Sequence, residues 1–198
     1  MNPIVRLLGA FALAAVLTGC AGTNFKRPDD GQFHLGKTTE SQVVDVLGDP
    51  EKTGEMLKND KTVRFNTYVF ASTRGVPLEE GVIPARAQVF YFLDDVLVGQ
   101  EFLSSFKDDH SNFDEGKVPG IKKGETTRSQ VVLNMGRPTS TYIAPMTKSG
   151  HGEAYGYAYN TTRGGAFSGF KISSKSLLVT FDENDKVLDV DYSATGNK

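Results

Sequence analysis

The sequence predicts an α+β fold built from two tandem repeats, each a short helical segment packed on an antiparallel β-meander of three or four strands. One observation is a fifteen-residue phrase that begins at Gly36 and recurs from Gly124, with nine identical positions at a constant offset of 88 residues. A second is that runs rich in aromatic and β-branched residues, typical of strands, follow both copies. A duplicated scaffold favours a binding surface over a catalytic pocket.

Each copy of the phrase predicts a helix of about two turns, over residues 40–47 and 128–135. A threonine precedes each helix, and a glutamine three residues later gives the spacing of a capping box, in which both side chains bond to backbone N–H groups at the helix start. The pairs are Thr39 with Gln42 and Thr127 with Gln130. Each helix is expected to end at a glycine, Gly48 or Gly136, because a proline two residues later prevents continuation.

Each predicted helix has one apolar side. The apolar positions are Val43, Val44 and Leu47 in the first helix and Val131, Val132 and Met135 in the second. Their spacing of i, i+1 and i+4 makes a stripe along one helix face. A helix this short is marginal alone. We therefore expect four of these residues to be buried against Phe92 and Phe181 of the sheet, namely Val43, Leu47, Val131 and Met135.

The residues after each helix predict a single strand and then a hairpin. The expected strands are 67–70 and 154–159, and the expected hairpins join 88–93 to 96–102 and 177–181 to 186–192. Gly99 interrupts one of these strands and predicts a β-bulge, because without a bulge Glu101 would point into the core.

The alternation along the strands predicts a partner-binding surface on the side of the sheet away from the helices. Its expected residues are Val89, Tyr91, Thr180, Asp189 and Asp191. In the last strand Leu188, Val190 and Tyr192 alternate with the two aspartates, so we expect these three apolar residues to face the helix. An apolar outer face indicates a partner site, unless another strand or the second repeat covers it. The sequence leaves both alternatives open.

The N-terminus predicts a lipoprotein signal peptide over residues 1–19. A basic start leads into an apolar run over residues 7–16, which is too short to span a bilayer, and then into Leu17-Thr-Gly-Cys20. This ending resembles a bacterial lipobox, which implies cleavage before Cys20 and lipidation of its sulfur. The alternative is an ordinary secretory signal with an unrelated cysteine. Cys20 is the only cysteine of the chain and forms no disulfide within it, which favours lipidation.

Four segments are expected after the signal peptide: a tether over residues 20–30, a first unit over 31–103, a linker over 104–118 and a second unit over 119–195. The 22 basic and 24 acidic residues nearly balance, so composition gives no reason to expect nucleic acid as a partner. The glycine-rich segment 150–169 is expected to be a mobile connection between strands or, alternatively, a recognition loop.

The chain carries no motif for catalysis or for a metal or cofactor. His34, His110 and His151 lack the spacing of a zinc site, and there is no nucleophile elbow, phosphate-binding loop or dinucleotide fingerprint. We therefore expect no catalytic residues, no metal, no cofactor and no small-molecule substrate.

The helix phrase, the aromatic strand and the hairpin, placed behind a lipobox, together resemble the SmpA/OmlA (BamE-like) family of small outer-membrane lipoproteins. The resemblance covers residues 31–103 and 119–193. It implies the fold that this family shares with the β-lactamase inhibitory protein, whose tandem units form a concave binding face.

The resemblance also implies a role. The expected protein is anchored in the outer membrane by its N-terminal lipid, has its body in the periplasm, and is a non-enzymatic scaffold that binds unidentified envelope proteins. Its expected task is an accessory one in outer-membrane protein assembly or envelope integrity. The alternative is an inhibitor that binds a periplasmic or incoming enzyme with its concave sheet. An enzyme would require a converging polar cluster that the sequence does not show.

The lipid anchor is directly testable. Replacing the acyl acceptor in a Cys20→Ser variant should abolish labelling with palmitate and leave an uncleaved or unanchored chain. Metabolic labelling followed by membrane fractionation measures both effects. Palmitate incorporation at the wild-type level in this variant would refute the lipobox assignment.

Overall fold

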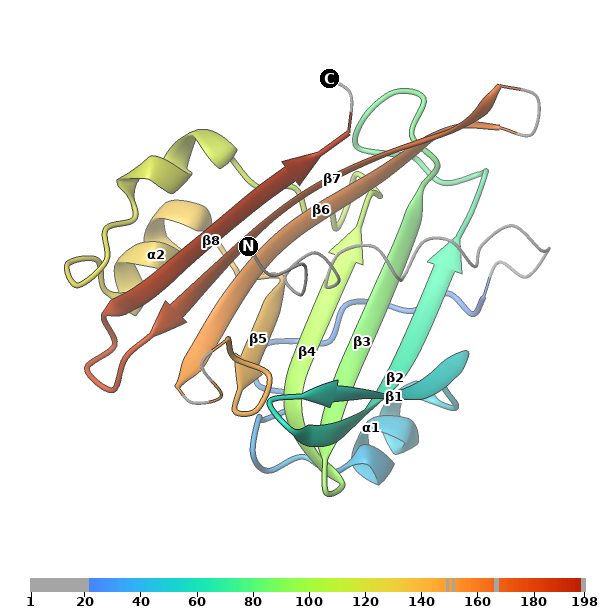
Figure 1. The fold of residues 1–198 in the computed structure, drawn as a ribbon. Coiled ribbons are helices and arrows are strands. Elements are labelled where there is room, and N and C mark those ends of the chain that lie inside the picture. Colours follow the sequence, from blue (N-terminus) through green and yellow to red (C-terminus); the bar gives the residue numbers. More distant parts are fainter. Residues whose placement is uncertain (1–21, 149, 151, 166–167, 197–198) are drawn as a thin grey trace.

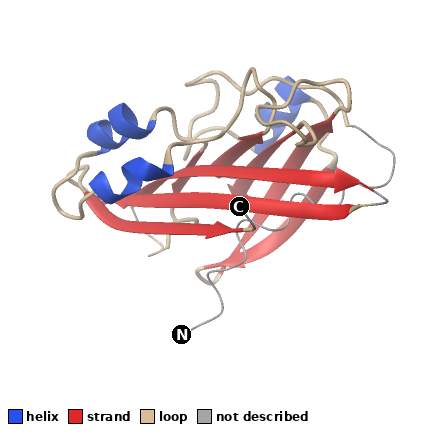
Figure 2. Cartoon of the chain, turned by 90° about the horizontal axis from the view of Figure 1, so that it is seen from above, coloured by secondary structure: helices blue, strands red, loops and turns tan. Residues whose placement is uncertain are grey.

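The computed structural model describes residues 22–148, 150, 152–165 and 168–196, so the predicted signal peptide and Cys20 lie outside the described residues. The fold is α+β, with eight antiparallel strands in chain order in one continuous sheet and short helices on one side of it (Figures 1 and 2). The helices are α1 (Glu40–Leu47), the 3-10 helix η2 (Glu115–Gly120) and α2 (Arg128–Met135). The strands are β1 (Lys52–Lys58), β2 (Lys61–Ala71), β3 (Ala85–Leu93), β4 (Val96–Ser104), β5 (Ser140–Ile143), β6 (Glu153–Gly165), β7 (Gly169–Phe181) and β8 (Val187–Thr195). Within the described residues, no helix is long and apolar enough to cross a membrane.

Both predicted helices are confirmed, with the predicted bounds. In each capping box the threonine hydroxyl accepts a hydrogen bond from the glutamine N–H, while the glutamine side chain accepts one from the threonine N–H at 2.9 Å for Thr39 and 2.8 Å for Thr127. The chain leaves each helix through a glycine with positive φ, 80° at Gly48 and 84° at Gly136. A residue with a Cβ atom is strained in that conformation, so glycine is the favoured residue at the end of each helix.

The helix stripes pack against the sheet in part: one valine of each is fully buried, whereas Val132 is 36% exposed. Val43 and Val131 are fully buried, and Phe92 and Phe181 are each only 1% exposed. The cluster under α1 consists of Phe33, Val43, Tyr68, Phe90, Phe92 and Leu97. The cluster under α2 consists of Phe113, Ile121, Val131, Tyr157, Leu177, Val179, Phe181 and Val187. Leu47 and Met135 are only partly buried, at the margins of these two clusters.

The two helices are held by matching hydrogen bonds. The glycine N–H in the turn before each helix donates to a strand carbonyl at 2.7 Å, and a tyrosine hydroxyl donates to the carbonyl of the glycine that ends the helix at 3.0 or 3.1 Å. Around α1 the pairs are Gly36 with Leu97 and Tyr68 with Gly48; around α2 they are Gly124 with Val187 and Tyr157 with Gly136. Segments 88 residues apart therefore adopt the same local arrangement.

Both predicted hairpins contain a β-bulge. The register of β3 against β4 shifts beside Gly99, where a bulge was predicted, and leaves Val98 as the extra residue. In the β7–β8 hairpin the register shifts between Thr180 and Phe181 and leaves Leu188 as the extra residue. The expectation that Leu188 faces the helix is therefore wrong: the bulge displaces it, and it is 49% exposed.

The glycine-rich segment 150–169 is not a long loop. Most of it forms β6, which pairs with β7 over their full lengths up to Gly165 opposite Gly169. The expected linker over 104–118 contains turns and the start of η2.

A matched pair of leucines tests the core. Leu97 is fully buried under α1, so Leu97→Ala should lower the free energy of unfolding by about 2–5 kcal/mol. Leu57 on β1 is 72% exposed, so Leu57→Ala should change it by no more than about 0.5 kcal/mol. Urea unfolding of both variants measures the difference; equal losses would contradict the packing described here.

Candidate binding surfaces

The sheet has a narrow seam at its centre. Only three residue pairs join β4 to β5: Gly99 with Tyr142, Gln100 with Thr141 and Glu101 with Ser140. One further bond continues the seam, from the Phe102 N–H to the Thr139 carbonyl at 2.8 Å. We call β1–β4 the first half of the sheet and β5–β8 the second half. Other parts of the chain cross the seam on both of its faces.

The N-terminal segment crosses the seam on the helix side. The Arg27 guanidinium donates from Nη2 to the Pro138 carbonyl at 2.5 Å, and Arg137 donates from Nη2 to the Pro28 carbonyl at 2.9 Å. Two Arg-Pro dipeptides thus exchange reciprocal hydrogen bonds. We call residues 22–31 the strap. From Gly22 onward, the segment expected to be a tether over residues 20–30 therefore packs against the folded body.

The strap is also held by the first half of the sheet. Arg86 on β3, itself only 9% exposed, donates from Nη1 to the Phe25 carbonyl at 2.6 Å. The Phe25 ring meets Tyr68 edge to face, with 6.5 Å between ring centroids. The strap therefore contacts both halves of the sheet.

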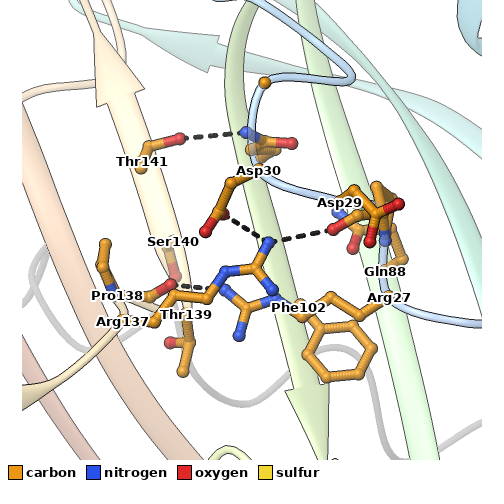
Figure 3. Close-up of a pocket in the computed structure, with 13 residues that line it drawn as sticks. Arg27, Asp29, Asp30, Gln88, Phe102, Arg137, Pro138, Thr139, Ser140 and Thr141 are labelled. Carbon is orange, nitrogen blue, oxygen red and sulfur yellow. Dashed lines mark hydrogen bonds and ion pairs between the residues drawn. The ribbon is translucent and has the colours of Figure 1, made fainter.

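A polar cavity of about 70 Å³ lies where the strap meets the seam (Figure 3). Its lining residues are Arg27–Gly31, Gln88, Gln100, Phe102 and Arg137–Thr141. The Arg27 guanidinium lies 5.2 Å from the centroid of the Phe102 ring, next to the guanidinium of Arg137. Burial, and then the neighbouring Arg137 charge, lower the pKa of Arg27 to about 10. The cavity therefore has two adjacent cations on its wall.

The opposite face of the first half is covered. The β1–β2 hairpin bends across β3 and β4 (Figure 1), and the Asn59 side chain in its turn donates to the carbonyls of Pro145 at 2.7 Å and Thr147 at 2.9 Å. The expectation that Val89 and Tyr91 form an exposed surface is therefore wrong, since they are 9% and 8% exposed. They pack in a cluster with Val63, Val98 and Met146.

Glu101 is a buried carboxylate at the seam beneath this cover. The bulge beside Gly99 keeps it off the helix-side core, but the side chain is still only 9% exposed. Its Oε2 accepts hydrogen bonds from the hydroxyls of Tyr91 at 3.3 Å and Tyr142 at 3.2 Å. Burial raises the pKa of Glu101 to about 6, and the two hydrogen bonds offset only part of that rise.

In the second half, the predicted site residues lie on the last two strands: Thr180 on β7, and Asp189 and Asp191 on the edge strand β8. Thr180 is 3% exposed, so its expected exposure is also wrong. Asp189 forms ion pairs with Lys123 and Lys148, and hydrogen bonds from both lysines hold its pKa below the usual range. Asp191 lies 3.6 Å from the Lys148 ammonium. Of the predicted surface, the two aspartates remain accessible, next to the exposed Leu188.

Arg27 and Arg137, the two arginines that meet at the seam, were not identified from the sequence. The signal that was present is the Arg-Pro dipeptide in the tether, which matches the Arg-Pro dipeptide directly after the second helix. The two dipeptides can exchange hydrogen bonds only because the fold brings them together. A single chain read in order gives no reason to pair them.

A comparison with known protein families agrees with the resemblance found in the sequence. Residues 112–191 match the family model described as outer membrane protein assembly factor BamE domain. This confirms the BamE-like resemblance for that part of the chain. A solved structure of a candidate β-lactamase inhibitor protein from Streptococcus mutans is 15% identical, with 79% of this chain and 82% of that chain covered and a TM-score of 0.41. No curated protein sequence matches the chain.

The pKa of Glu101 predicts a pH dependence of stability. Because the folded value of about 6 exceeds the ordinary 4.5, the folded chain holds a proton that the unfolded chain releases between these pH values. This contribution is therefore fully present below pH 4.5 and is lost as the pH rises through 6, a change of about 2 kcal/mol.

A Glu101→Gln variant should lack this contribution, so its stability relative to wild type should rise by about 2 kcal/mol between pH 4.5 and pH 7. Urea unfolding of both proteins across this range measures the difference, and Glu183→Gln, in the exposed β7–β8 turn, is the control. A stability difference between Glu101→Gln and wild type that does not change with pH would contradict the assignment.

Proposed function

We propose that this protein is a non-enzymatic lipoprotein of the outer membrane whose body lies in the periplasm, binds envelope proteins and assists outer-membrane protein assembly. The observation that carries the proposal is the match of residues 112–191 to the assembly-factor domain. The matched region contains α2, β5, β6, β7 and most of β8. An assembly factor needs surfaces for other proteins, which agrees with an open sheet whose edges lie at β1 and β8.

The proposal includes a duplication, with residues 31–103 and 119–195 as two copies of one BamE-like unit and residues 104–118 as the linker between them. Its support is the recurring phrase in the sequence, with nine of fifteen positions identical, and the matching hydrogen bonds around α1 and α2. Under this proposal, β1–β4 and β5–β8 are equivalent sets of strands that share one sheet. Duplication enlarges the surface without requiring a new fold.

A lipid on Cys20 would hold the body through Gly22. Gly22 approaches β2 so closely that a Cβ atom on it would lie 1.9 Å from the Val69 carbonyl oxygen. Two residues span at most about 7 Å, so a lipid on Cys20 would hold this side of β2 next to the membrane. The strap would then fix how the body is oriented on the membrane.

We place the protein partner at the β8 edge, within the matched region. Leu188 is a large apolar residue that is 49% exposed, and Asp189 and Asp191 follow it on the same strand. Its counterpart Val98, the extra residue of the first bulge, is 5% exposed because the β1–β2 hairpin covers that part of the first half. An exposed apolar residue with polar neighbours fits an interface with an apolar centre and a polar rim.

The alternative function, an enzyme inhibitor that uses a concave sheet, requires an open face across both halves. In this structure the β1–β2 hairpin, held by Asn59 to the β5–β6 connection, closes that face over the first half. This geometry favours a partner at the edge of the sheet over one that fills its centre.

Complementation of a deletion strain tests the function. Loss of the protein should lower the folded fraction of outer-membrane proteins, which is measured by their resistance to SDS without heating. Wild type and Leu57→Ser should restore it, because Leu57 is an exposed leucine on the opposite edge strand. Leu188→Ser should restore it only partly. Unchanged folding of outer-membrane proteins in the deletion strain would refute the assembly role, whereas full rescue by Leu188→Ser would refute the proposed partner surface.

A further inference from the structure

We propose that the cavity between the strap and the seam is a binding site for an oxyanion, the phosphate or carboxylate group of a small ligand. This site is distinct from the proposed partner surface at β8 and does not rest on the assembly role. The inference stands on three features of the cavity: an unpaired cation, an exposed carboxylate that an arriving anion can replace, and neutral donors on the cavity floor.

The unpaired cation is Arg27. Among the described residues it makes no salt bridge, and its one hydrogen bond runs from Nη2 to the Pro138 carbonyl. A guanidinium has five N–H donors in a planar fork suited to carboxylate and phosphate. The side chain is half-buried against Phe102, so water screens its charge less than at an open surface. Arg27 therefore has spare donors, and the carboxylates of Asp30 and Asp109 favour its charge without forming an ion pair with it among the described residues.

Arg137 adds a second positive charge beside the first. Its guanidinium is next to that of Arg27 (Figure 3), and the repulsion contributes to the lowered pKa of Arg27. An anion held between the two would remove this repulsion. Paired arginines are a common means of binding phosphate and carboxylate with defined geometry.

The carboxylate that now pairs with Arg137 is easily replaced. Asp30 lies 2.6 Å from Arg137 Nη2, but its side chain is 79% exposed. Exposed ion pairs of this kind contribute between about 0 and 1 kcal/mol. A ligand oxyanion can therefore replace the Asp30 carboxylate beside Arg137 at little cost in free energy, with the Asp30 side chain rotating out toward the solvent.

The floor of the cavity supplies neutral hydrogen-bonding groups. Gln88 on β3 is 2% exposed, and within the described part of the chain its amide makes only a long bond of 3.4 Å, to the Val89 carbonyl. Gln100 on β4 donates to the Thr141 hydroxyl at 3.3 Å. A buried amide without a good partner costs free energy, and a ligand oxygen would satisfy it. The cavity volume of about 70 Å³ is several times the roughly 10–15 Å³ that one water molecule needs, so a phosphate or carboxylate group fits.

The test uses the full ¹⁵N-labelled chain in a non-ionic maltoside detergent and a phosphate-free buffer. The probes are inorganic phosphate, acetate and dihexanoyl phosphatidic acid below its micelle concentration, each at constant ionic strength against chloride. The side-chain amide signals of Gln88 and Gln100 should shift and saturate. Those of Gln42 and Gln130, in the two capping boxes, should not. Saturation by phosphate or acetate indicates a free anion as ligand, and saturation by the lipid alone indicates a headgroup.

Matched arginine variants complete the experiment. Arg27→Gln should weaken binding at least tenfold, and Arg27→Lys should fall between it and wild type because the charge remains without the fork. Arg74→Gln, at an exposed arginine in the β2–β3 loop, should bind as wild type does. The proposal is overturned if no probe gives saturable shifts at Gln88 and Gln100, or if Arg27→Gln binds as tightly as Arg74→Gln. Should Arg27→Gln not fold, the wild-type contrast between the two pairs of glutamines decides.

Discussion

The whole architecture depends on the junction between β4 and β5. Three residue pairs and one additional backbone bond are all that β-pairing supplies there, whereas β6 and β7 pair over thirteen residues each. A junction this short would leave the two halves of the sheet weakly coupled. The chain compensates with contacts on both faces: the Arg-Pro exchange on the helix side and the Asn59 bonds on the other. A third contact joins the β2–β3 loop to β6, where the Ile83 N–H donates to the Thr162 carbonyl at 2.9 Å.

Polar groups are concentrated at this junction, which lies between the apolar clusters under α1 and α2. Glu101 is buried there with two tyrosine hydroxyls as donors, and Gln88 and Gln100 lie on the opposite face of the same strands. Buried polar groups are costly unless they are satisfied. Burial raises the pKa of Glu101. The buried amide of Gln88 makes a long hydrogen bond and can bind a ligand oxygen. The seam thus holds both a pH-dependent contribution to stability and the proposed oxyanion site.

The covering of one face explains why the surface predicted from alternation was only partly right. Alternation assigned Val89 and Tyr91 correctly to the side away from the helix, because side-chain direction follows from strand period alone. Their exposure depends on the bend of the β1–β2 hairpin, which brings Val63 and Met146 over them. In the second half no such hairpin lies over β8, and Asp189, Asp191 and Leu188 remain accessible. The same strand pattern therefore gives a buried face in one half and an accessible edge in the other.

The sequence by itself determined the local structure: both helices with their capping boxes and glycine ends, the hairpins, and the bulge beside Gly99. These features follow from interactions between residues close in the chain, namely hydrogen bonds to nearby backbone, steric limits on φ, and the periods of helix and strand. Only the tertiary structure decided that all strands join in one sheet, that Arg27 meets Arg137, and that Glu101 lies in a closed environment. The reciprocal Arg-Pro bonds join residues 109 and 111 positions apart, and the bond from Tyr142 to Glu101 joins residues 41 positions apart. No local rule pairs residues at that distance, because burial and charge pairing depend on which surfaces the folded chain brings together.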